Sequence, residues 1–200
     1  MSIFKNKKIS VSVFCGAREG KNKAYATTAE MVGNLIAKNN MRLVYGAGGK
    51  GLMGKVAYGV LALKGLIFGI TTKIIADFEE PIRGTKFKVV KNIQLRKRAF
   101  IDNSDAFIVL PGGFGTFDEL FEILVSKEIN DKHDKLLNKK DTTFNKPIVL
   151  VNVNGFFAPF EKLVDSIIDA GFMNPSNRKY FKIVNSPKEA IDYIKKHTKK

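Results

Sequence analysis

The sequence predicts a three-layer, doubly wound α/β fold of the Rossmann-like type, with a mostly parallel sheet. Short apolar segments alternate along the chain with segments whose apolar residues recur at helical spacing, as in βαβ units. Two of the expected strands, 107–110 and 148–151, are wholly apolar, which is typical of strands buried on both faces of a parallel sheet. With 200 residues, 44% of them hydrophobic, the chain can form one core without disulfides or metals. We therefore expect a single domain over residues 1–200.

The first half of the chain is expected to alternate strand and helix. Residues 9–15 are an apolar run that ends at Gly16, and residues 23–38 carry Ala26, Ala29, Val32, Leu35 and Ile36 on one helix face. The expected strands are 9–15, 42–45 and 66–71, and the expected helices are 23–38 and 51–63. This order corresponds to consecutive βαβ units.

The second half repeats the pattern with one longer interruption. The expected strands are 86–90, 106–110, 147–153 and 181–184, and the expected helices are 92–103, 116–129, 156–170 and 187–196. Gly171 follows the third of these helices, where a left-handed C-cap residue is required. Residues 130–145 are polar, rich in Lys and Asp, and longer than a usual connection. We expect them to be a surface insertion.

The chain is strongly basic, with a formal net charge of +15, so nucleic acid must be considered as a partner. The lysines are scattered, with small clusters near each end, and are not interleaved with aromatics as a base-stacking surface would need. We expect a solvated lysine-rich surface and no nucleic-acid partner. The positive field would still attract anionic nucleotides.

Neither a secretory signal nor a membrane span is expected. Residues 1–8 are polar and basic, and no segment offers about twenty consecutive apolar residues. Cys15, the single cysteine, lies in an apolar run and is expected to pack in the core. These features favour a cytoplasmic protein without a membrane partner.

Two glycine-rich turns follow expected strands and open helices. The first contains Gly46, Gly48 and Gly51, which spell G-x-G-x-x-G, but the expected acidic residue after the next strand is missing. Close packing of helix against sheet would equally explain this turn. Backbone amides at the start of a helix can bind an anion, so an anion site here remains an alternative.

The second turn is the stronger signal for an anion site. Gly112, Gly113 and Gly115 directly follow the most apolar expected strand, and three glycines let the backbone approach a phosphate closely. Thr116 and Glu119 also match a T-x-x-E capping box, in which both would serve only the helix end. Glu119 and Glu122 would share one helix face near the ligand. Both interpretations of Glu119 stay open at this point.

One combination of motifs resembles a known family. Arg96-Lys97, followed by Pro111-Gly112-Gly113-Phe114-Gly115-Thr116-Phe117-Asp118-Glu119, is similar to the paired RK and PGGxGTxxE motifs of the Lonely Guy (LOG) family. Members are cytokinin riboside 5'-monophosphate phosphoribohydrolases, often mislabelled as lysine decarboxylases. The resemblance covers nearly the whole chain. Departures are Ala17, where members commonly carry serine, and residues 125–128, which replace a threonine-tryptophan segment.

The resemblance implies a Rossmann-like homodimer that uses no metal or other cofactor and acts on a small nucleoside monophosphate. Its products would be a free base and ribose 5-phosphate. By the match of motifs, Arg96 and Glu119 are the catalytic pair. The residues expected to bind substrate are Gly48, Glu80, Lys97, Gly112, Gly113, Gly115, Thr116 and Glu122. The family's upstream acid falls at Glu79 or Glu80.

Cleavage of an N-ribosidic bond builds positive charge on the ribose, so a carboxylate near the anomeric carbon would help. Glu119 could stabilise that charge or act as a general base toward water. Arg96 could hold the phosphate or stabilise the departing base. The rival hypotheses are a non-catalytic nucleotide-binding or carrier module of the same fold, and a nucleic-acid-binding protein of the kind found in the DNA-processing protein A family.

Overall fold

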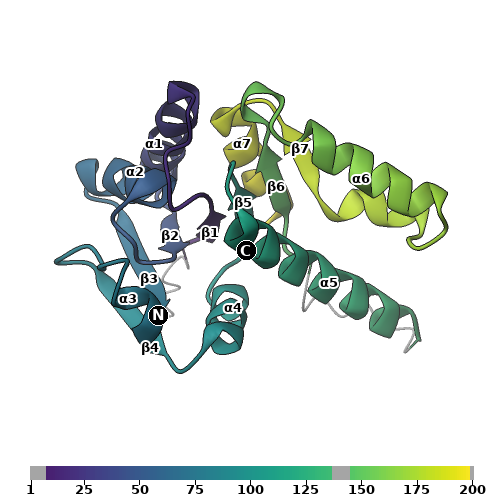
Figure 1. The fold of residues 1–200 in the computed structure, drawn as a ribbon, viewed down its shortest axis with the longest axis horizontal. Helices are drawn as coiled ribbons and strands as arrows, with labels where there is room; N and C mark the ends of the chain where they lie inside the picture. The colour runs from purple at the N-terminus through teal and green to yellow at the C-terminus, as the bar shows by residue number, and fades with distance from the viewer. Residues whose placement is uncertain (1–7, 137–144, 199–200) are drawn as a thin grey trace, which may run out of the picture.

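The computed structural model describes residues 8–136 and 145–198, which form one seven-stranded sheet with helices on both faces (Figure 1). The strands are β1 Ser10–Phe14, β2 Arg42–Tyr45, β3 Leu66–Thr72, β4 Lys86–Val90, β5 Ala106–Val109, β6 Ile148–Val151 and β7 Lys182–Val184. Their spatial order is β4-β3-β2-β1-β5-β6-β7, and every neighbouring pair is parallel. The predicted Rossmann-like, doubly wound α/β fold is confirmed.

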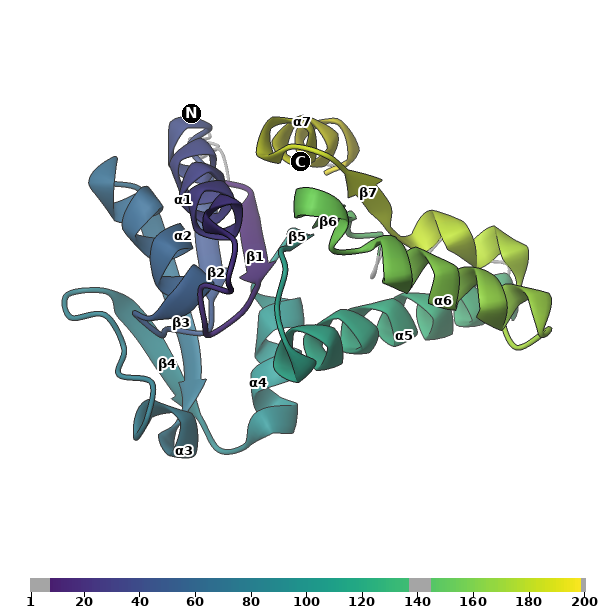
Figure 2. The same cartoon turned by 45° about the horizontal axis from the view of Figure 1, so that its top comes forward.

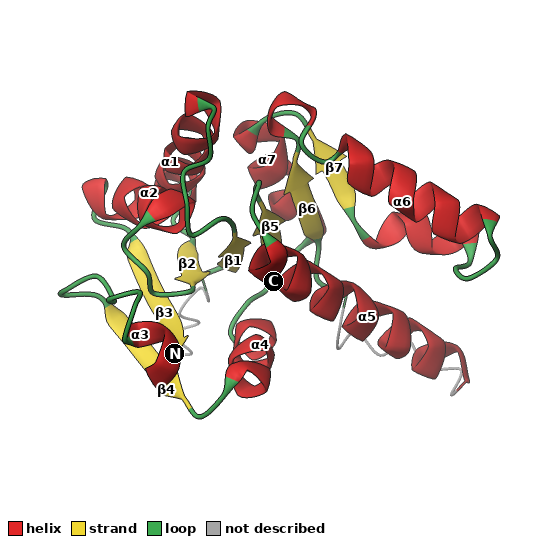
Figure 3. Ribbon diagram, viewed as in Figure 1, coloured by secondary structure: helices red, strands yellow, loops and turns green. Residues whose placement is uncertain are grey.

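The helices form the two outer layers (Figures 2 and 3). They are α1 Lys23–Lys38, α2 Gly51–Ala62, α3 Lys73–Ala76, α4 Ile93–Asp102, α5 Phe114–Leu136, α6 Ala158–Asp169 and α7 Pro187–His197, with short 3-10 turns η1 Val153–Gly155 and η2 Pro175–Tyr180. Helices α1, α2 and α7 pack on one face, and α4, α5 and α6 on the other.

Buried strand residues explain why the layers form. All four residues of β5 and of β6 are buried, and they alternate between the two apolar cores on either side of the sheet. In β5, Ile108 joins the core under α1, α2 and α7, whereas Phe107 and Val109 join the core under α4, α5 and α6. Burial on both faces is what the unbroken apolar runs predicted.

Helix α5 differs from the prediction at both ends. It begins at Phe114, two residues earlier than expected, and continues to Leu136. Residues 130–136 therefore belong to this helix and not to a loop insertion; residues 137–144 lie outside the described part of the chain. Side-chain contacts sustain the extra turns: Asn130 Nδ2 donates to the Ser126 carbonyl at 2.7 Å, and Tyr180 Oη donates to Asp131 Oδ2 at 2.7 Å. Tertiary contact with η2 thus extends a polar helix that local hydrophobic spacing did not reveal.

The short helix α3 was not predicted. Thr72, the last residue of β3, caps it by accepting a hydrogen bond from the Ile75 amide at 3.2 Å. Four residues are too few to give a helical periodicity in the sequence. The segment matters because it borders the functional cavity.

The direction in which successive strands are added to the sheet reverses at its centre. From β1 the strands follow one another outward to β4, and from β5 they follow one another outward to β7 on the opposite side. The adjacent carboxyl ends of β1 and β5 are therefore the topological switch point, where ligands bind in open α/β sheets.

Candidate active site

A cavity of about 490 Å³ opens at this switch point. Its size suits a nucleotide-sized ligand. The loop after β1, the starts of α2 and α5, the segment around α3 and one side chain of α4 contribute to its wall. The lining residues are Cys15, Gly16, Ala17, Arg18, Glu19, Gly20, Tyr25, Leu52, Met53, Ile75, Phe78, Glu79, Arg96, Pro111, Gly112, Gly113, Gly115, Thr116, Glu119 and Phe156.

The second glycine-rich turn forms one wall of the cavity. A Cβ on Gly112 would collide with the Thr116 side chain and lie 2.9 Å from the Gly16 amide nitrogen, so this residue must be glycine. Around Gly113 and Gly115, by contrast, a Cβ would meet nothing within 4 Å. The first amides of α5 have no acceptor within their own helix and carry its positive dipole end. The predicted anion-binding turn therefore faces open space beside the cavity.

Arg96 and Glu119 meet inside the cavity. Arg96 Nη1 lies 3.3 Å from Glu119 Oε1, with only 11% and 14% of the two side chains exposed. Two backbone carbonyls accept hydrogen bonds from the same guanidinium: Ile70 O from Nε at 3.0 Å and Gly46 O from Nη2 at 3.5 Å. Arg96 Cζ lies over the Phe100 ring, 5.0 Å from the ring centroid. Arg96 is thus fixed by four partners, and one of its nitrogens faces Glu119.

The environment of Glu119 raises its pKa. Burial raises the pKa of this carboxyl from the usual 4.5 to about 7, with the charges of Asp118 and Glu79 acting in the same direction. The Arg96 guanidinium opposes the shift. Glu119 therefore exchanges its proton near neutral pH, as a group that accepts or donates a proton in catalysis must.

The capping-box interpretation of Thr116 and Glu119 is wrong. Helix α5 begins before Thr116, so Thr116 lies within its first turn and cannot be the N-cap. The carboxylate of Glu119 contacts Arg96, 23 residues away in sequence. A long-range ion pair has replaced the local contact that the T-x-x-E spacing suggested.

Lys97 and Glu122 form a separate cluster that does not line the cavity. Lys97 Nζ lies 3.0 Å from Asp118 Oδ1 and 2.9 Å from Glu122 Oε2. The hydrogen bonds that Lys97 donates to Glu122 and Asp118 raise its pKa. This cluster of three residues ties α4 to α5 next to the Arg96–Glu119 pair.

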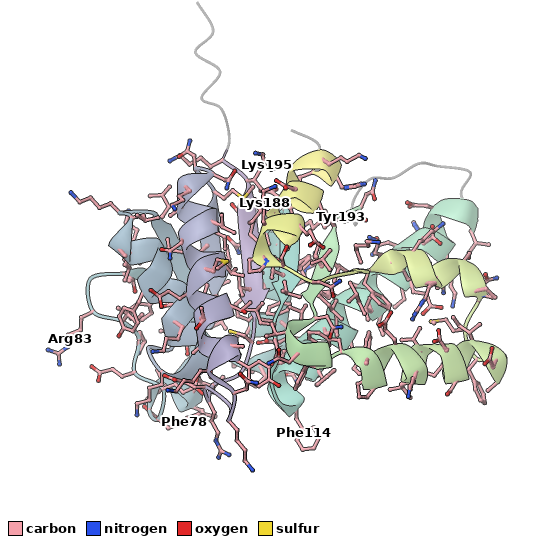
Figure 4. All side chains as sticks on the ribbon, turned by 90° about the horizontal axis from the view of Figure 1, so that it is seen from above. Phe78, Arg83, Phe114, Lys188, Tyr193 and Lys195 are labelled. Atoms are coloured by element: carbon pink, nitrogen blue, oxygen red, sulfur yellow. The ribbon has the colours of Figure 1, made fainter. Side chains whose placement is uncertain are left out.

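Of the two upstream acids, Glu79 and not Glu80 reaches the cavity. Glu79 is among the lining residues, and its Oε2 would lie 3.3 Å from a Cβ on Gly48. The side chain of Glu80 is 76% exposed and pairs with Arg83 at 3.7 Å. Figure 4 shows Arg83 extending away from the body of the protein. Of the two acids that the sequence left open, the structure thus places Glu79 at the cavity and Glu80, which we had expected to bind substrate, outside it.

Gly48 itself does not line the cavity. It forms an isolated bridge with Pro81 and lies behind Glu79. The glycines of the first turn thus pack against other parts of the protein, while Leu52 and Met53 at the start of α2 line the cavity.

Apolar side chains line the rest of the cavity and its rim. Tyr25 and Phe156 face each other edge to face, with centroids 6.1 Å apart. Phe78 is 62% exposed, and Phe114, just before the cavity wall at Gly115, is 97% exposed. Figure 4 shows Phe78 and Phe114 at the same edge of the molecule. Sequence reasoning missed these residues and Arg18, because they lie in loops or at helix ends where no spacing marks them.

Cys15 also lines the cavity, and burial raises its pKa far above the usual value. A thiol in this state is a poor nucleophile. Within the described ranges, no group of three or more His, Cys, Asp or Glu residues is arranged to hold a metal ion. No helix of the described segments is both long and apolar enough to cross a membrane.

The fold and the site together define a Rossmann-type α/β protein with an open glycine-rich turn and an acid–guanidinium pair at its switch point. A family model described as "Possible lysine decarboxylase" matches residues 53–194. The probable cytokinin riboside 5'-monophosphate phosphoribohydrolase LOGL2 of Oryza sativa subsp. japonica is 34% identical, over 94% of this chain and 72% of its own. The cytokinin riboside 5'-monophosphate phosphoribohydrolase of Rhodococcoides fascians is 33% identical, over 93% and 89%. The chain belongs to the LOG family.

Solved structures share the fold at lower identity. A molybdenum cofactor binding protein from Rippkaea orientalis superposes with a TM-score of 0.67 at 20% identity, covering 96% of this chain and 98% of its own. The molybdenum cofactor carrier protein of Chlamydomonas reinhardtii gives a TM-score of 0.68 at 19% identity, over 95% and 98%. At this identity the likeness concerns the fold alone.

Proposed function

We propose that this protein hydrolyses the N-glycosidic bond of a nucleoside 5'-monophosphate, of the cytokinin or purine type, to a free base and ribose 5-phosphate. One observation carries the proposal: the Arg96–Glu119 pair lies in the same cavity as the open glycine turn that begins α5. The turn suits a phosphate, and the acid suits a bond that develops positive charge. The relatives' names as phosphoribohydrolases agree with this chemistry.

The reaction needs a carboxylate on the ribose side of the bond. As the bond from C1' to nitrogen breaks, its electron pair leaves with the base and the ribose becomes oxocarbenium-like. The Glu119 carboxylate stabilises that charge and accepts the proton of the attacking water. The departing base takes a proton from solvent on a ring nitrogen, and Glu119 returns its proton to solvent. Water thus supplies the hydroxyl of ribose 5-phosphate.

Arg96 positions Glu119 in this proposal. Two of its nitrogens are engaged by the carbonyls of Ile70 and Gly46, so the remaining donors are fixed relative to the sheet. A guanidinium held in this way orients the carboxylate and limits the rise of its pKa. The same charge favours electron flow toward a departing base.

We also propose that the protein is a cytoplasmic homodimer. The exposed side of α5 carries Phe121, Val125 and Ile129, which are 41%, 50% and 60% exposed and lie on one helix face at i, i+4 and i+8. Leu95 of α4 is 48% exposed. An apolar stripe of this kind on a monomer surface favours contact with a second copy.

The direct test is to incubate the purified protein with AMP and with isopentenyladenosine monophosphate, alongside the two nucleosides, and to follow free base by chromatography. Release from the monophosphates but not from the nucleosides is expected. Binding of AMP without release of adenine, in folded protein, would favour the non-catalytic carrier. Release from both monophosphates at similar rates would classify the enzyme as an AMP nucleosidase as well.

A further inference from the structure

Arg18 lies in the loop between β1 and α1 and lines the same cavity as the glycine turn at the start of α5. The Gly16 amide donates to the Pro111 carbonyl at 3.0 Å, which joins the loop after β1 to the turn after β5. A Cβ on Gly16 would lie 3.0 Å from the Arg18 carbonyl oxygen and 3.4 Å from Gly112 Cα. Gly16 therefore lies between the Arg18 carbonyl and the start of the glycine turn, and links the two.

The backbone of this loop is also fixed from the side of α2. The Leu52 amide donates to the Gly16 carbonyl at 3.0 Å. Gly51 has a φ of +58°, and a Cβ there would collide with the carbonyl carbon of Ala17. Two close approaches thus hold the residues before Arg18, while Arg18 is exposed and lines the cavity.

The other charged groups of the cavity wall are already engaged or are negative. Arg96 pairs with Glu119 at 3.3 Å, and Glu19 pairs with Lys55 at 3.4 Å. Glu79 adds a further negative charge. Among the described residues of the wall, Arg18 is the cation for which the structure contains no ion pair or hydrogen bond.

A phosphomonoester brings a charge of about −1.5 to −2 at neutral pH. The helix end opposes it with about half a positive charge, and the Arg96 charge is offset by Glu119. A full positive charge on the cavity wall that is not offset by a carboxylate would therefore complement the phosphate. A guanidinium also offers a planar fork of donors that fits two phosphate oxygens at once.

We infer that Arg18 is a phosphate-binding residue that closes on the substrate 5'-phosphate from the side opposite the α5 amides. The inference rests on the proposed function for the identity of the ligand. It predicts that Arg18 supplies binding energy common to substrate and product, because both carry the 5'-phosphate. It also predicts that Arg18 underlies part of the preference for nucleotides over nucleosides.

The experiment compares R18A and R18K with K21A as the matched control. Lys21 is an exposed cation three residues further along the same loop, and it does not line the cavity. Calorimetry with ribose 5-phosphate measures binding, and steady-state hydrolysis of AMP and of isopentenyladenosine monophosphate measures KM and kcat. Thermal unfolding checks that each variant is folded.

For R18A we expect Kd for ribose 5-phosphate and KM for nucleotide to rise by about 10- to 100-fold, with kcat within about threefold of wild type. R18K should lie between, because it keeps the charge and loses the fork. K21A should match wild type. Equal binding of ribose 5-phosphate by R18A and wild type overturns the inference, as does a fall in kcat with unchanged Kd.

The two proposals fail in different ways. Wild-type protein that binds ribose 5-phosphate through Arg18 but releases no base overturns the proposed hydrolysis and supports the role of Arg18. Hydrolysis by R18A with unchanged KM supports the proposed hydrolysis and overturns the role of Arg18.

Discussion

The two glycine-rich turns look alike in sequence but serve different purposes. In the first, a Cβ at any of several glycines would meet protein atoms: on Gly46 it would lie 2.5 Å from Arg96 Nη2, and on Gly54 it would collide with the Gly49 carbonyl. In the second, Gly113 and Gly115 have open space. Close packing of the protein on itself thus requires glycine in the first turn and at Gly112 of the second, whereas Gly113 and Gly115 leave room for a ligand.

The two turns contribute to the site in different ways. The first turn packs around Arg96 and Glu79. Its Gly46 carbonyl accepts a hydrogen bond from Arg96 Nη2. The second turn presents amides to the cavity and starts the helix that carries Glu119. Changes near the second turn should therefore affect the reaction, and changes in the first should affect stability.

The largest effect should come from Glu119→Gln, one helical turn beyond Gly115. We expect kcat to fall by at least about 100-fold, since the amide cannot accept a proton from water or stabilise positive charge. The variant should remain folded, because the side chains are nearly isosteric. Hydrolysis of a nucleoside monophosphate measures the effect, and a near-normal rate in folded protein would remove Glu119 from the mechanism.

The pKa of Glu119 makes a linked prediction on pH. A carboxyl whose pKa rises to about 7 on folding favours the folded state below its usual pKa of 4.5, and this contribution is lost as the pH rises through 7. Wild-type protein should therefore lose stability relative to E119Q by on the order of 1–3 kcal/mol between pH 4.5 and pH 8. Activity should instead fall as the pH drops below about 7, because the carboxylate is the reacting form. Chemical denaturation of both proteins and a kcat/KM profile measure these trends, and a flat stability difference would contradict the raised pKa.

Gly54→Ala should mainly reduce stability. Its Cβ would meet the Gly49 backbone, which cannot rotate aside as a side chain can. We expect the free energy of unfolding to fall by about 1–3 kcal/mol, as for other overpacked sites. Urea denaturation measures it. An unchanged midpoint would show that the first turn adapts easily, and the contrast between the turns would not hold.

Gly115→Ala is the matched substitution at the second turn. Stability should be unchanged or higher, because the Cβ meets nothing within 4 Å and alanine favours helix. The added methyl occupies space beside the amides, so KM for the nucleotide should rise about tenfold. Denaturation and steady-state kinetics on the same preparation separate the two effects. Weaker folding with normal KM would reverse our assignment of the turns.

The smallest effects are expected at Glu79 and Glu80, the two acids that follow α3. Glu79→Ala should raise KM or lower kcat by roughly 3- to 10-fold, as expected when one substrate contact is lost. Glu80→Ala should change neither by more than about twofold, since its exposed pair with Arg83 contributes little. The two variants form a matched pair, because each removes one carboxylate and the two positions are adjacent. Equal effects of the two substitutions would contradict our assignment of Glu79, and not Glu80, to the substrate cavity.

Much of the fold followed from local pattern. The helix Lys23–Lys38 and the strands Arg42–Tyr45 and Lys86–Val90 have the predicted bounds, because apolar spacing and flanking glycine or asparagine act within a few residues. The extent of α5 was missed, since its last turns are polar and are stabilised by contact with η2.

Only those site residues that belong to a recognisable motif could be predicted from the sequence. Arg96, Glu119 and the glycine turn have a spacing that the LOG resemblance recognises. Glu79, Phe78 and Arg18 reach the cavity from loops, where the direction of a side chain depends on packing against other segments. No periodicity in the sequence reports such directions.

The sequence by itself determined the layered α/β class, the order of strands and helices, and the family. These follow from short-range apolar periodicity and from motifs in which each residue is close to the next. Only the tertiary structure decided which glycines have open space beside the cavity, that Glu119 pairs with Arg96 and does not cap its own helix, and that Glu79 and Arg18 line the same cavity. These outcomes depend on contacts between segments far apart in the chain, and such contacts fix burial, charge pairing and open space together.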